Sequence, residues 1–475
     1  MSRALSACFS ACLLALSACW AVPAAAQPAA DKAVLDARDA MRSNDRNRLA
    51  TLREQALRQQ HPLASWVDYW EISARLKEAQ QPELDAFYAR WPGSYVEDRL
   101  RNDWLLVLGE RRDWDNLRRE HPRFRMADDR EVDCYALLVR HLDGQDVTDA
   151  AASAWLAQRR EDDGCKLMAR TLAEAGRFGP EQVWPVVRLA VETGRPKAAL
   201  AAAALLGTPV ERRLRDALDN PTQWLARHPR SAVQERDGEA ALAALLRVAS
   251  SDPEAAAGLA ADWEERLVPS QSAYAWAGIG RQAALRLAPT AAAAYNRAWA
   301  HVRSEHRMDW PAETLVWGAR AALRAERGPD WALLLRQVQA MGPAEQADPA
   351  WVYWKARALL ATAAKGEKGD TARAEAQRQL QALAGPQSFY GLLALEDLGG
   401  RFVPPPAPAP LSEAERQAAR DVPGLQRALQ LIALGLRSEG VREWNFTLRD
   451  LNGDRALLAA AQQACALTSA RKGVG

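Results

Sequence analysis

Apolar residues recur with helical spacing along almost the whole chain. One example is a run at every fourth position that comprises Val96, Leu100, Trp104 and Leu108. Residues with this spacing fall on one face of an α-helix. Ser94 precedes the run and Glu97 follows three positions later, an arrangement in which both side chains can hydrogen-bond to the free backbone N–H groups of the first turn. The pattern predicts a helix that starts after Ser94 and ends at Gly109.

Proline and glycine interrupt these apolar stripes at short intervals. A proline follows a histidine at three points, His61–Pro62, His121–Pro122 and His228–Pro229. Because the residue before a proline disfavours helical angles, each pair predicts a helix boundary. The helices are therefore expected to be about 10–15 residues long. No stretch alternates apolar and polar residues with β-branched side chains, so no β-sheet is predicted.

Helix pairs that recur over about 350 residues favour an all-α repeat fold, an α-solenoid in which each hairpin buries its apolar stripe on its neighbours. The chain contains 18 tryptophans, and in an exported protein such side chains can stack on sugar rings. Several of them instead fall on the apolar stripes of predicted helices, namely Trp66, Trp70, Trp104, Trp351 and Trp354. We therefore assign these tryptophans to the core.

A proline-rich segment divides the chain. Residues 401–410 read RFVPPPAPAP, and five prolines in seven residues favour an extended polyproline II spacer over a helix. Ser412 and Glu415 then repeat the helix-start pattern seen at Ser94. The sequence predicts a helical-repeat domain at residues 27–400, the spacer, a small helical linker domain at residues 411–465, and an irregular tail at residues 466–475.

Residues 1–26 have the composition of an export signal peptide. Arg3 supplies a positive charge, an apolar stretch follows, and Ala24–Ala26 form a cleavage site. Leu16–Cys19 also resembles a bacterial lipobox, which would attach a lipid to Cys19. We expect free export to the periplasm, with an outer-membrane lipoprotein as the alternative. The rest of the sequence has no uncharged apolar run of about 18 residues, so no membrane-spanning helix is expected.

Removal of the export signal would leave three cysteines, Cys134, Cys165 and Cys465. In an oxidising compartment Cys134 and Cys165, 31 positions apart, are the expected disulfide pair. In the chain-entropy account such a bond contributes about 3–4 kcal/mol of stability. Cys465 would then be left without a partner.

Charge and motifs exclude several classes of function. The formal net charge of +2 does not indicate a nucleic-acid-binding surface. His301 and His306 lie about 140° apart around a helix, so they cannot share a metal ion. The acid pairs Asp162–Asp163 and Glu264–Glu265 also point apart, and the sequence contains no phosphate-binding glycine loop and no nucleophile elbow. We assign no catalytic residue, no cofactor and no metal ligand.

Five segments are less generic than the rest. They are HPLASWVDYWEISARL at 61–76, PGSYVEDRLRNDWLLVLGERRDW at 92–114, WVYWKARALL at 351–360, SFYGLLALEDLGG at 388–400 and LGLRSEGVREWNFTLRDL at 434–451. Their order, together with the cysteine pair and the export signal, resembles the large soluble lytic transglycosylases of Gram-negative bacteria. The resemblance covers residues 33–465.

The resemblance implies a right-handed superhelix that closes into a ring, followed by a linker domain and a lysozyme-like catalytic domain. In that family the catalytic domain cleaves the β-1,4 bond between N-acetylmuramic acid and N-acetylglucosamine. One glutamate acts as acid and then as base, which gives a 1,6-anhydro product and requires a raised pKa. The Glu-Ser pair and the Gly-Leu-Met-Gln run of that domain have no counterpart among the 475 residues. We therefore expect a truncated, inactive scaffold.

The implied partners are the glycan strands of peptidoglycan and other cell-wall enzymes. Nucleic acid is not an expected partner, and a membrane is expected only if Cys19 is lipidated. We expect a monomer. One alternative is a non-catalytic wall-binding protein whose arginines contact the carboxylates of stem peptides. The other is a periplasmic helical-repeat adaptor that has no relation to the wall.

Overall fold

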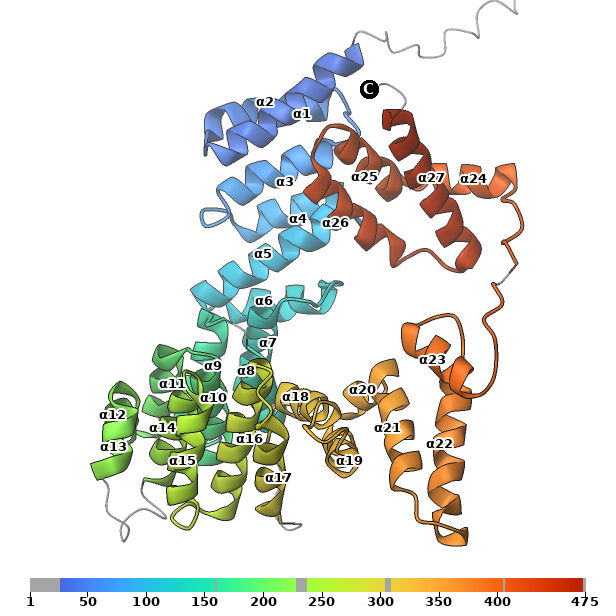
Figure 1. The fold of residues 1–475 in the computed structure, drawn as a ribbon. Coiled ribbons are helices and arrows are strands. Elements are labelled where there is room, and N and C mark those ends of the chain that lie inside the picture. Colours follow the sequence, from blue (N-terminus) through green and yellow to red (C-terminus); the bar gives the residue numbers. More distant parts are fainter. Residues whose placement is uncertain (1–25, 159, 228–236, 304–308, 405, 473–475) are drawn as a thin grey trace, which may run out of the picture. The chain divides into compact units, whose positions relative to one another are not determined.

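The computed structural model describes residues 26–158, 160–227, 237–303, 309–404 and 406–472 (Figure 1). Within these ranges the secondary structure is helical and contains no strand, which confirms the predicted all-α class. None of the described helices is both long and apolar enough to cross a membrane. The predicted export signal, up to residue 25, and the lipidation candidate Cys19 lie outside the described residues.

The chain forms two compact units. Unit 1 comprises residues 1–146, 162–165 and 408–475, and unit 2 comprises residues 147–161 and 166–407. The boundary between Ala407 and Pro408 falls inside the predicted spacer. Unit 1 combines segments from both ends of the sequence, a grouping that the hydrophobic pattern does not indicate.

Seven helices make up the first part of unit 1. They are α1 (Ala26–Arg42), α2 (Arg46–Arg58), α3 (Ala64–Ala74), α4 (Gln81–Arg90), α5 (Tyr95–Arg111), α6 (Trp114–Glu120) and α7 (Arg130–Leu142). The helix predicted from the fourfold spacing is α5. The Ser94 hydroxyl accepts a hydrogen bond from the Glu97 N–H at 3.2 Å, which confirms the first half of the capping pattern, whereas the Glu97 carboxylate accepts from the Gly93 N–H at 2.6 Å, one residue before Ser94. The helix ends two residues later than predicted, before Arg112 in a left-handed conformation.

Four helices form the C-terminal part of unit 1. They are α24 (Glu413–Arg420), α25 (Pro423–Ala433), α26 (Arg437–Leu448) and α27 (Asp454–Lys472). The second capping pattern is confirmed, because the Glu415 N–H donates to the Ser412 hydroxyl at 3.2 Å and Glu415 in turn accepts from the Ser412 N–H at 2.7 Å. The last helix continues past Cys465 into the segment expected to be irregular. Alanine, leucine, arginine and lysine in that segment all favour helix.

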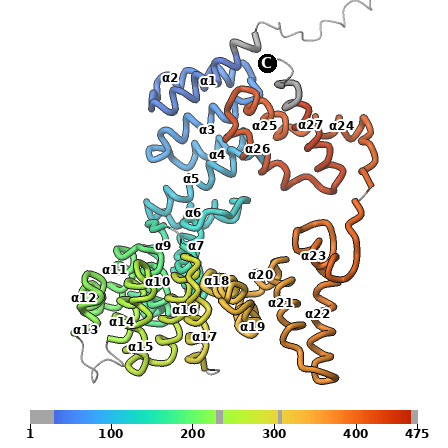
Figure 2. The backbone as a smooth tube through the Cα atoms, viewed as in Figure 1, coloured from blue at the N-terminus to red at the C-terminus, as the bar shows by residue number. Residues whose placement is uncertain are grey.

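The two parts of unit 1 pack together at a buried seam (Figure 2). We call Trp66, Arg427 and Glu443 the seam triad. The Glu443 side chain is fully buried, with Oε2 accepting from Trp66 Nε1 at 2.7 Å and Oε1 accepting from Arg427 Nη2 at 2.7 Å. Nearby, the rings of Tyr95 and Phe446 meet edge to face at 5.8 Å. Helices almost 400 positions apart in the sequence therefore share one core.

Unit 2 is a succession of antiparallel helices. They are α8 (Thr148–Leu156), α9 (Asp163–Glu174, which starts in unit 1), α10 (Pro180–Glu192), α11 (Pro196–Ala203), α12 (Thr208–Asp219), α13 (Pro221–Arg227), α14 (Gly238–Ala249), α15 (Pro253–Trp263), α16 (Pro269–Leu285), α17 (Ala291–Ala300), α18 (Ala312–Leu323), α19 (Trp331–Ala340), α20 (Pro343–Gln346), α21 (Pro349–Thr362), α22 (Asp370–Leu383) and α23 (Phe389–Asp397). Each packs mainly on its neighbours in sequence, as expected of a helical-hairpin solenoid.

The tryptophans that the sequence assigns to the core are buried. Trp66, Trp70 and Trp104 are at most 2% exposed, and Trp351 is 8% exposed. Trp354 is partly buried against the cluster around Tyr353. This confirms the core assignment of Trp66, Trp70, Trp104 and Trp351, because a ring at these exposures has no face available for a sugar.

Candidate functional site

Of the residues singled out from the sequence, two cysteines are joined. Cys134 of α7 and Cys165 of α9 form a disulfide with their Cα atoms 4.9 Å apart, and both side chains are fully buried. Both cysteines belong to unit 1, so the bond fixes the start of α9 against α7. Cys465 lies exposed on α27, outside this disulfide.

The sequence pattern excludes His301 and His306 as ligands of one shared metal ion. His301 lies against the carboxylate of Glu264, which Arg297 also contacts. His306 lies outside the described residues. Among the residues that the structure describes, no three His, Cys, Asp or Glu side chains gather as metal ligands would.

Glu192, at the end of α10, has the electrostatics of a general acid without its accessibility. Its side chain is 2% exposed, and Oε2 accepts from Arg281 Nη1 of α16 at 3.1 Å. Burial raises the pKa of Glu192 to about 7, although Arg281 opposes the shift. A general acid must lie within hydrogen-bond reach of the bond it protonates. Because Glu192 is packed between helices, a glycan cannot reach it, and we assign it a structural role.

This pKa predicts a pH-dependent effect of Glu192→Gln. The folded-state pKa of about 7 lies above the ordinary 4.5, so burial favours the protonated form. The stability that this form contributes is present below pH 4.5 and is lost as the pH rises to about 7. We expect the variant to match the wild type at pH 4.5 and to exceed its unfolding free energy by about 2–3 kcal/mol at pH 8. Urea denaturation at both pH values measures the difference.

Glu181, exposed on the same helix, gives the matched control. Glu181→Gln should change the free energy of unfolding by less than about 1 kcal/mol at either pH, as expected of a surface substitution. A Glu192→Gln effect that is also independent of pH would show that the carboxyl keeps its ordinary pKa on folding.

A different feature of unit 1 has the geometry of a binding site. A cavity of about 320 Å³ lies between α4 and α6 and is lined by Asp85, Tyr88, Arg119 and Arg123. Asp85 and Tyr88 are one turn apart on α4, Arg119 is in the last turn of α6, and Arg123 ends the 3₁₀ turn that follows (His121–Arg123). We call this cavity the arginine pocket.

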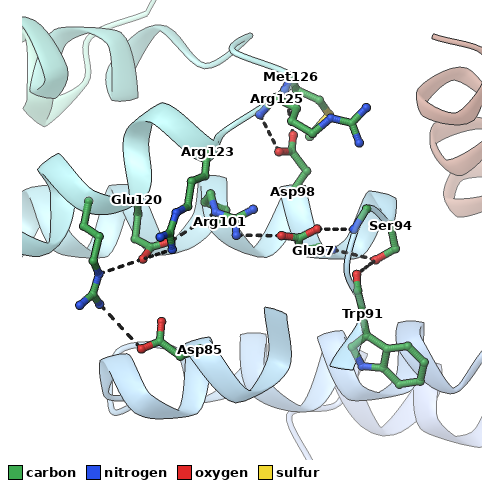
Figure 3. Close-up of polar contacts among 12 residues, drawn as sticks. Asp85, Trp91, Ser94, Glu97, Asp98, Arg101, Glu120, Arg123, Arg125 and Met126 are labelled. Carbon is green, nitrogen blue, oxygen red and sulfur yellow. Dashed lines mark hydrogen bonds and ion pairs between the residues drawn. The ribbon is translucent and has the colours of Figure 1, made fainter. Parts of the chain in front are cut away.

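A buried carboxylate anchors the arginines of the pocket. Glu120 is fully buried, and its Oε1 accepts from Arg119 Nε at 3.2 Å and lies 3.6 Å from Arg123 Nη1 (Figure 3). Its other oxygen accepts from Arg101 Nε at 3.3 Å. Three guanidinium groups therefore surround one carboxylate, which holds them in place although all carry the same charge.

The back of the pocket is packed and polar. Arg101 is 4% exposed, donates to Glu97 at 2.8 Å, and lies over the Tyr88 ring with Cζ 4.1 Å from its centre. The Tyr88 hydroxyl is buried and has no hydrogen-bond partner among the described residues. Burial raises the pKa of Tyr88 well above its ordinary value, so the hydroxyl keeps its proton. A buried donor without an acceptor is uncommon and calls for an explanation.

Backbone contacts fix the loop that follows Arg123. The Arg125 N–H donates to Asp98 Oδ1 at 2.6 Å, and the Met126 N–H donates to Asp98 Oδ2 at 2.9 Å (Figure 3). Asp98 is on α5 and is 1% exposed. The loop is thereby tied to α5, and this contact positions the 3₁₀ turn that carries Arg123.

The pocket presents opposite charges on its two sides. The side chains of Arg119 and Arg123 are 45% and 58% exposed, and Glu120 accepts a hydrogen bond from only one of their N–H groups. On the other side, Asp85 Oδ1 accepts from Gln81 at 2.8 Å, while Oδ2 stays 3.8 Å from Arg119 Nη2. Arg119 and Asp85 thus form a long, exposed ion pair, and a ligand that carries both charges can replace this contact with one contact to each side chain.

Sequence patterns do not reveal the arginine pocket. Asp85 and Arg119 are 34 positions apart on helices whose exposed faces carry many charges. One signal was present in the sequence: Glu120 follows two arginines and directly precedes the helix-breaking His121–Pro122. It does not show, however, that Glu120 is buried.

No protein-family model matches the sequence, and no curated protein matches it. Solved structures, in contrast, do match this chain. The lytic transglycosylase Slt from Pseudomonas aeruginosa is similar with a TM-score of 0.60 and 23% identity, over 92% of this chain and 68% of that one. The 70 kDa soluble lytic transglycosylase SLT70 from Escherichia coli has a TM-score of 0.53 and 17% identity over the same shares. The resemblance seen in the sequence is thus confirmed as a likeness of fold.

Proposed function

We propose that this chain is the helical scaffold of a lytic transglycosylase and that it binds peptidoglycan. The similarity to two lytic transglycosylases over 92% of the chain is the observation that carries the proposal. The five ordered segments of the sequence support it independently, since they span residues 61–451. A wall-binding protein of this kind acts in the periplasm, which agrees with residues 1–26 as an export signal and with Cys19 removed along with it.

We further propose that residues 27–475 hold glycan strands without cleaving them. The two motifs that carry the catalytic glutamate in the family are missing from the sequence. Glu192 has the raised pKa of a general acid, but its 2% exposed side chain cannot meet a glycosidic oxygen.

The proposal predicts no product when residues 27–475 are incubated with purified sacculi. The soluble fraction should contain no 1,6-anhydro-muropeptides by liquid chromatography and mass spectrometry. An active lytic transglycosylase on the same sacculi is the positive control. Anhydro products above the level of a buffer blank would disprove the non-cleaving role and would require a proton donor within these residues.

A further inference from the structure

We propose that the arginine pocket binds the free α-amino-acid end of a peptide. Arg119 and Arg123 would hold its carboxylate, and Asp85 would hold its ammonium group. This inference rests on the proposed function, because peptidoglycan stem peptides carry such a zwitterion on the side chain of their diamino acid. The pocket would therefore recognise the peptide of the wall, while the helical scaffold follows the glycan.

The carboxylate half of the pocket consists of two arginines with exposed N–H donors. Around Glu120, three guanidiniums meet three carboxylates, namely Glu120 itself, Glu97 beside Arg101, and Asp85 at 3.8 Å from Arg119. Arg123 lies 3.6 Å from Glu120, beyond hydrogen-bond distance. Its planar fork, beside that of Arg119, matches the two oxygens of a ligand carboxylate.

Asp85 explains why a simple anion is the wrong ligand. Its side chain is 50% exposed and lines the cavity, with Oδ2 3.8 Å from Arg119 Nη2. A lone carboxylate in the pocket would be repelled by Asp85, whereas an ammonium group one carbon away from that carboxylate would be attracted. A zwitterion can therefore replace the long ion pair between Arg119 and Asp85 and satisfy both charges.

The Tyr88 hydroxyl gives an independent reason to expect a ligand. Tyr88 is 7% exposed and lines the same cavity, and its proton has no acceptor among the described residues. The hydroxyl is buried in the free protein, so a ligand carboxylate would supply that acceptor once the exposed ends of Arg119 and Arg123 move to bind it. Glu120 and Asp98 already fix the arginine anchor and the loop, which confines the reordering to these side-chain ends.

The test uses the stem tetrapeptide L-Ala-γ-D-Glu-meso-diaminopimelate-D-Ala, titrated calorimetrically into residues 27–475. Its matched analogue contains lysine in place of diaminopimelate, which removes only the side-chain carboxylate. We expect the diaminopimelate peptide to bind at least about tenfold more tightly than the lysine peptide, because one charge-assisted contact is lost. Equal affinity for the two peptides, or no binding of either at millimolar concentration, would overturn the inference.

Three variants assign the contacts. Arg119→Gln/Arg123→Gln should lower the affinity for the diaminopimelate peptide at least about tenfold and leave the affinity for the lysine peptide unchanged. Arg42→Gln/Arg58→Gln, two exposed arginines of the same unit, is the control and should change neither. Tyr88→Phe should weaken peptide binding while leaving thermal stability unchanged or higher, because the hydroxyl it removes has no hydrogen-bond partner in the part of the chain that the structure describes. Weaker binding that only accompanies lower stability would contradict the Tyr88 contact.

Retention on sacculi separates this inference from the proposed function. If the wild type sediments with sacculi but does not distinguish the two peptides, the pocket assignment is wrong and the wall-binding role stands. If it discriminates between the peptides but does not sediment, the pocket is a peptide site and the wall-binding role is wrong. If both proposals hold, the wild type should sediment with sacculi and should also distinguish the two peptides.

Discussion

Glu443→Ala is expected to lower the free energy of unfolding of unit 1 by about 3–5 kcal/mol, the cost of removing one partner from a buried charge pair. Glu443 is fully buried, and its two oxygens accept from Arg427 and from Trp66 Nε1. Alanine would leave the Arg427 charge and the indole N–H without acceptors inside the seam. The contact joins α3 to α25 and α26, so its loss should weaken both parts of the unit.

Hydrogen exchange measures this effect locally. In the Glu443→Ala variant the amides of α3 and those of α26 should lose protection together. Asp450→Ala is the matched control, because Asp450 pairs with Arg125 at the same junction but is 53% exposed. Asp450→Ala should lower the free energy of unfolding by less than about 1 kcal/mol. Protection lost in α26 alone would mean that the seam triad does not couple the two ends of the chain.

The second large effect is expected from the disulfide. Cys134→Ala/Cys165→Ala should lower the free energy of unfolding by about 3–4 kcal/mol. The disulfide closes a 31-residue loop and so reduces the entropy of the unfolded chain. Both cysteines are fully buried, so their replacement also removes sulfur atoms from the packed junction of α7 and α9.

Urea denaturation with and without reductant checks this expectation. The wild type should lose stability in reductant, and the double variant should not change further. Cys465→Ala removes an exposed thiol and should match the wild type. A double variant as stable as Cys465→Ala would show that the disulfide makes no net contribution.

Local patterns were sufficient to predict the helices. The α5 helix followed from fourfold apolar spacing and a Ser-x-x-Glu start, because both depend on contacts within a few residues. The burial of Trp66, Trp70 and Trp104 followed from the same stripes. The end of α27 could not be predicted from such patterns, since no glycine or proline marks it before Gly473.

Contacts between distant segments could not be predicted in this way. Trp66 and Glu443 are 377 positions apart, and nothing in either stripe indicates which other stripe it meets. Glu192 lies at the end of an amphipathic helix, where a glutamate is normally solvated, and its burial depends on the packing of α16. The arginine pocket was missed for the same reason, because Glu120 becomes an anchor only when α4, α5 and α6 enclose it.

Sedimentation with purified sacculi tests the central claim most directly. Residues 27–475 are mixed with increasing amounts of sacculi at low salt, pelleted, and the fraction of protein in the pellet is measured against a soluble helical protein of similar size. A peptidoglycan-binding scaffold predicts retention that rises to saturation and falls when sacculi are stripped of their stem peptides. Retention no higher than that of the reference protein at every amount of sacculi would contradict the account.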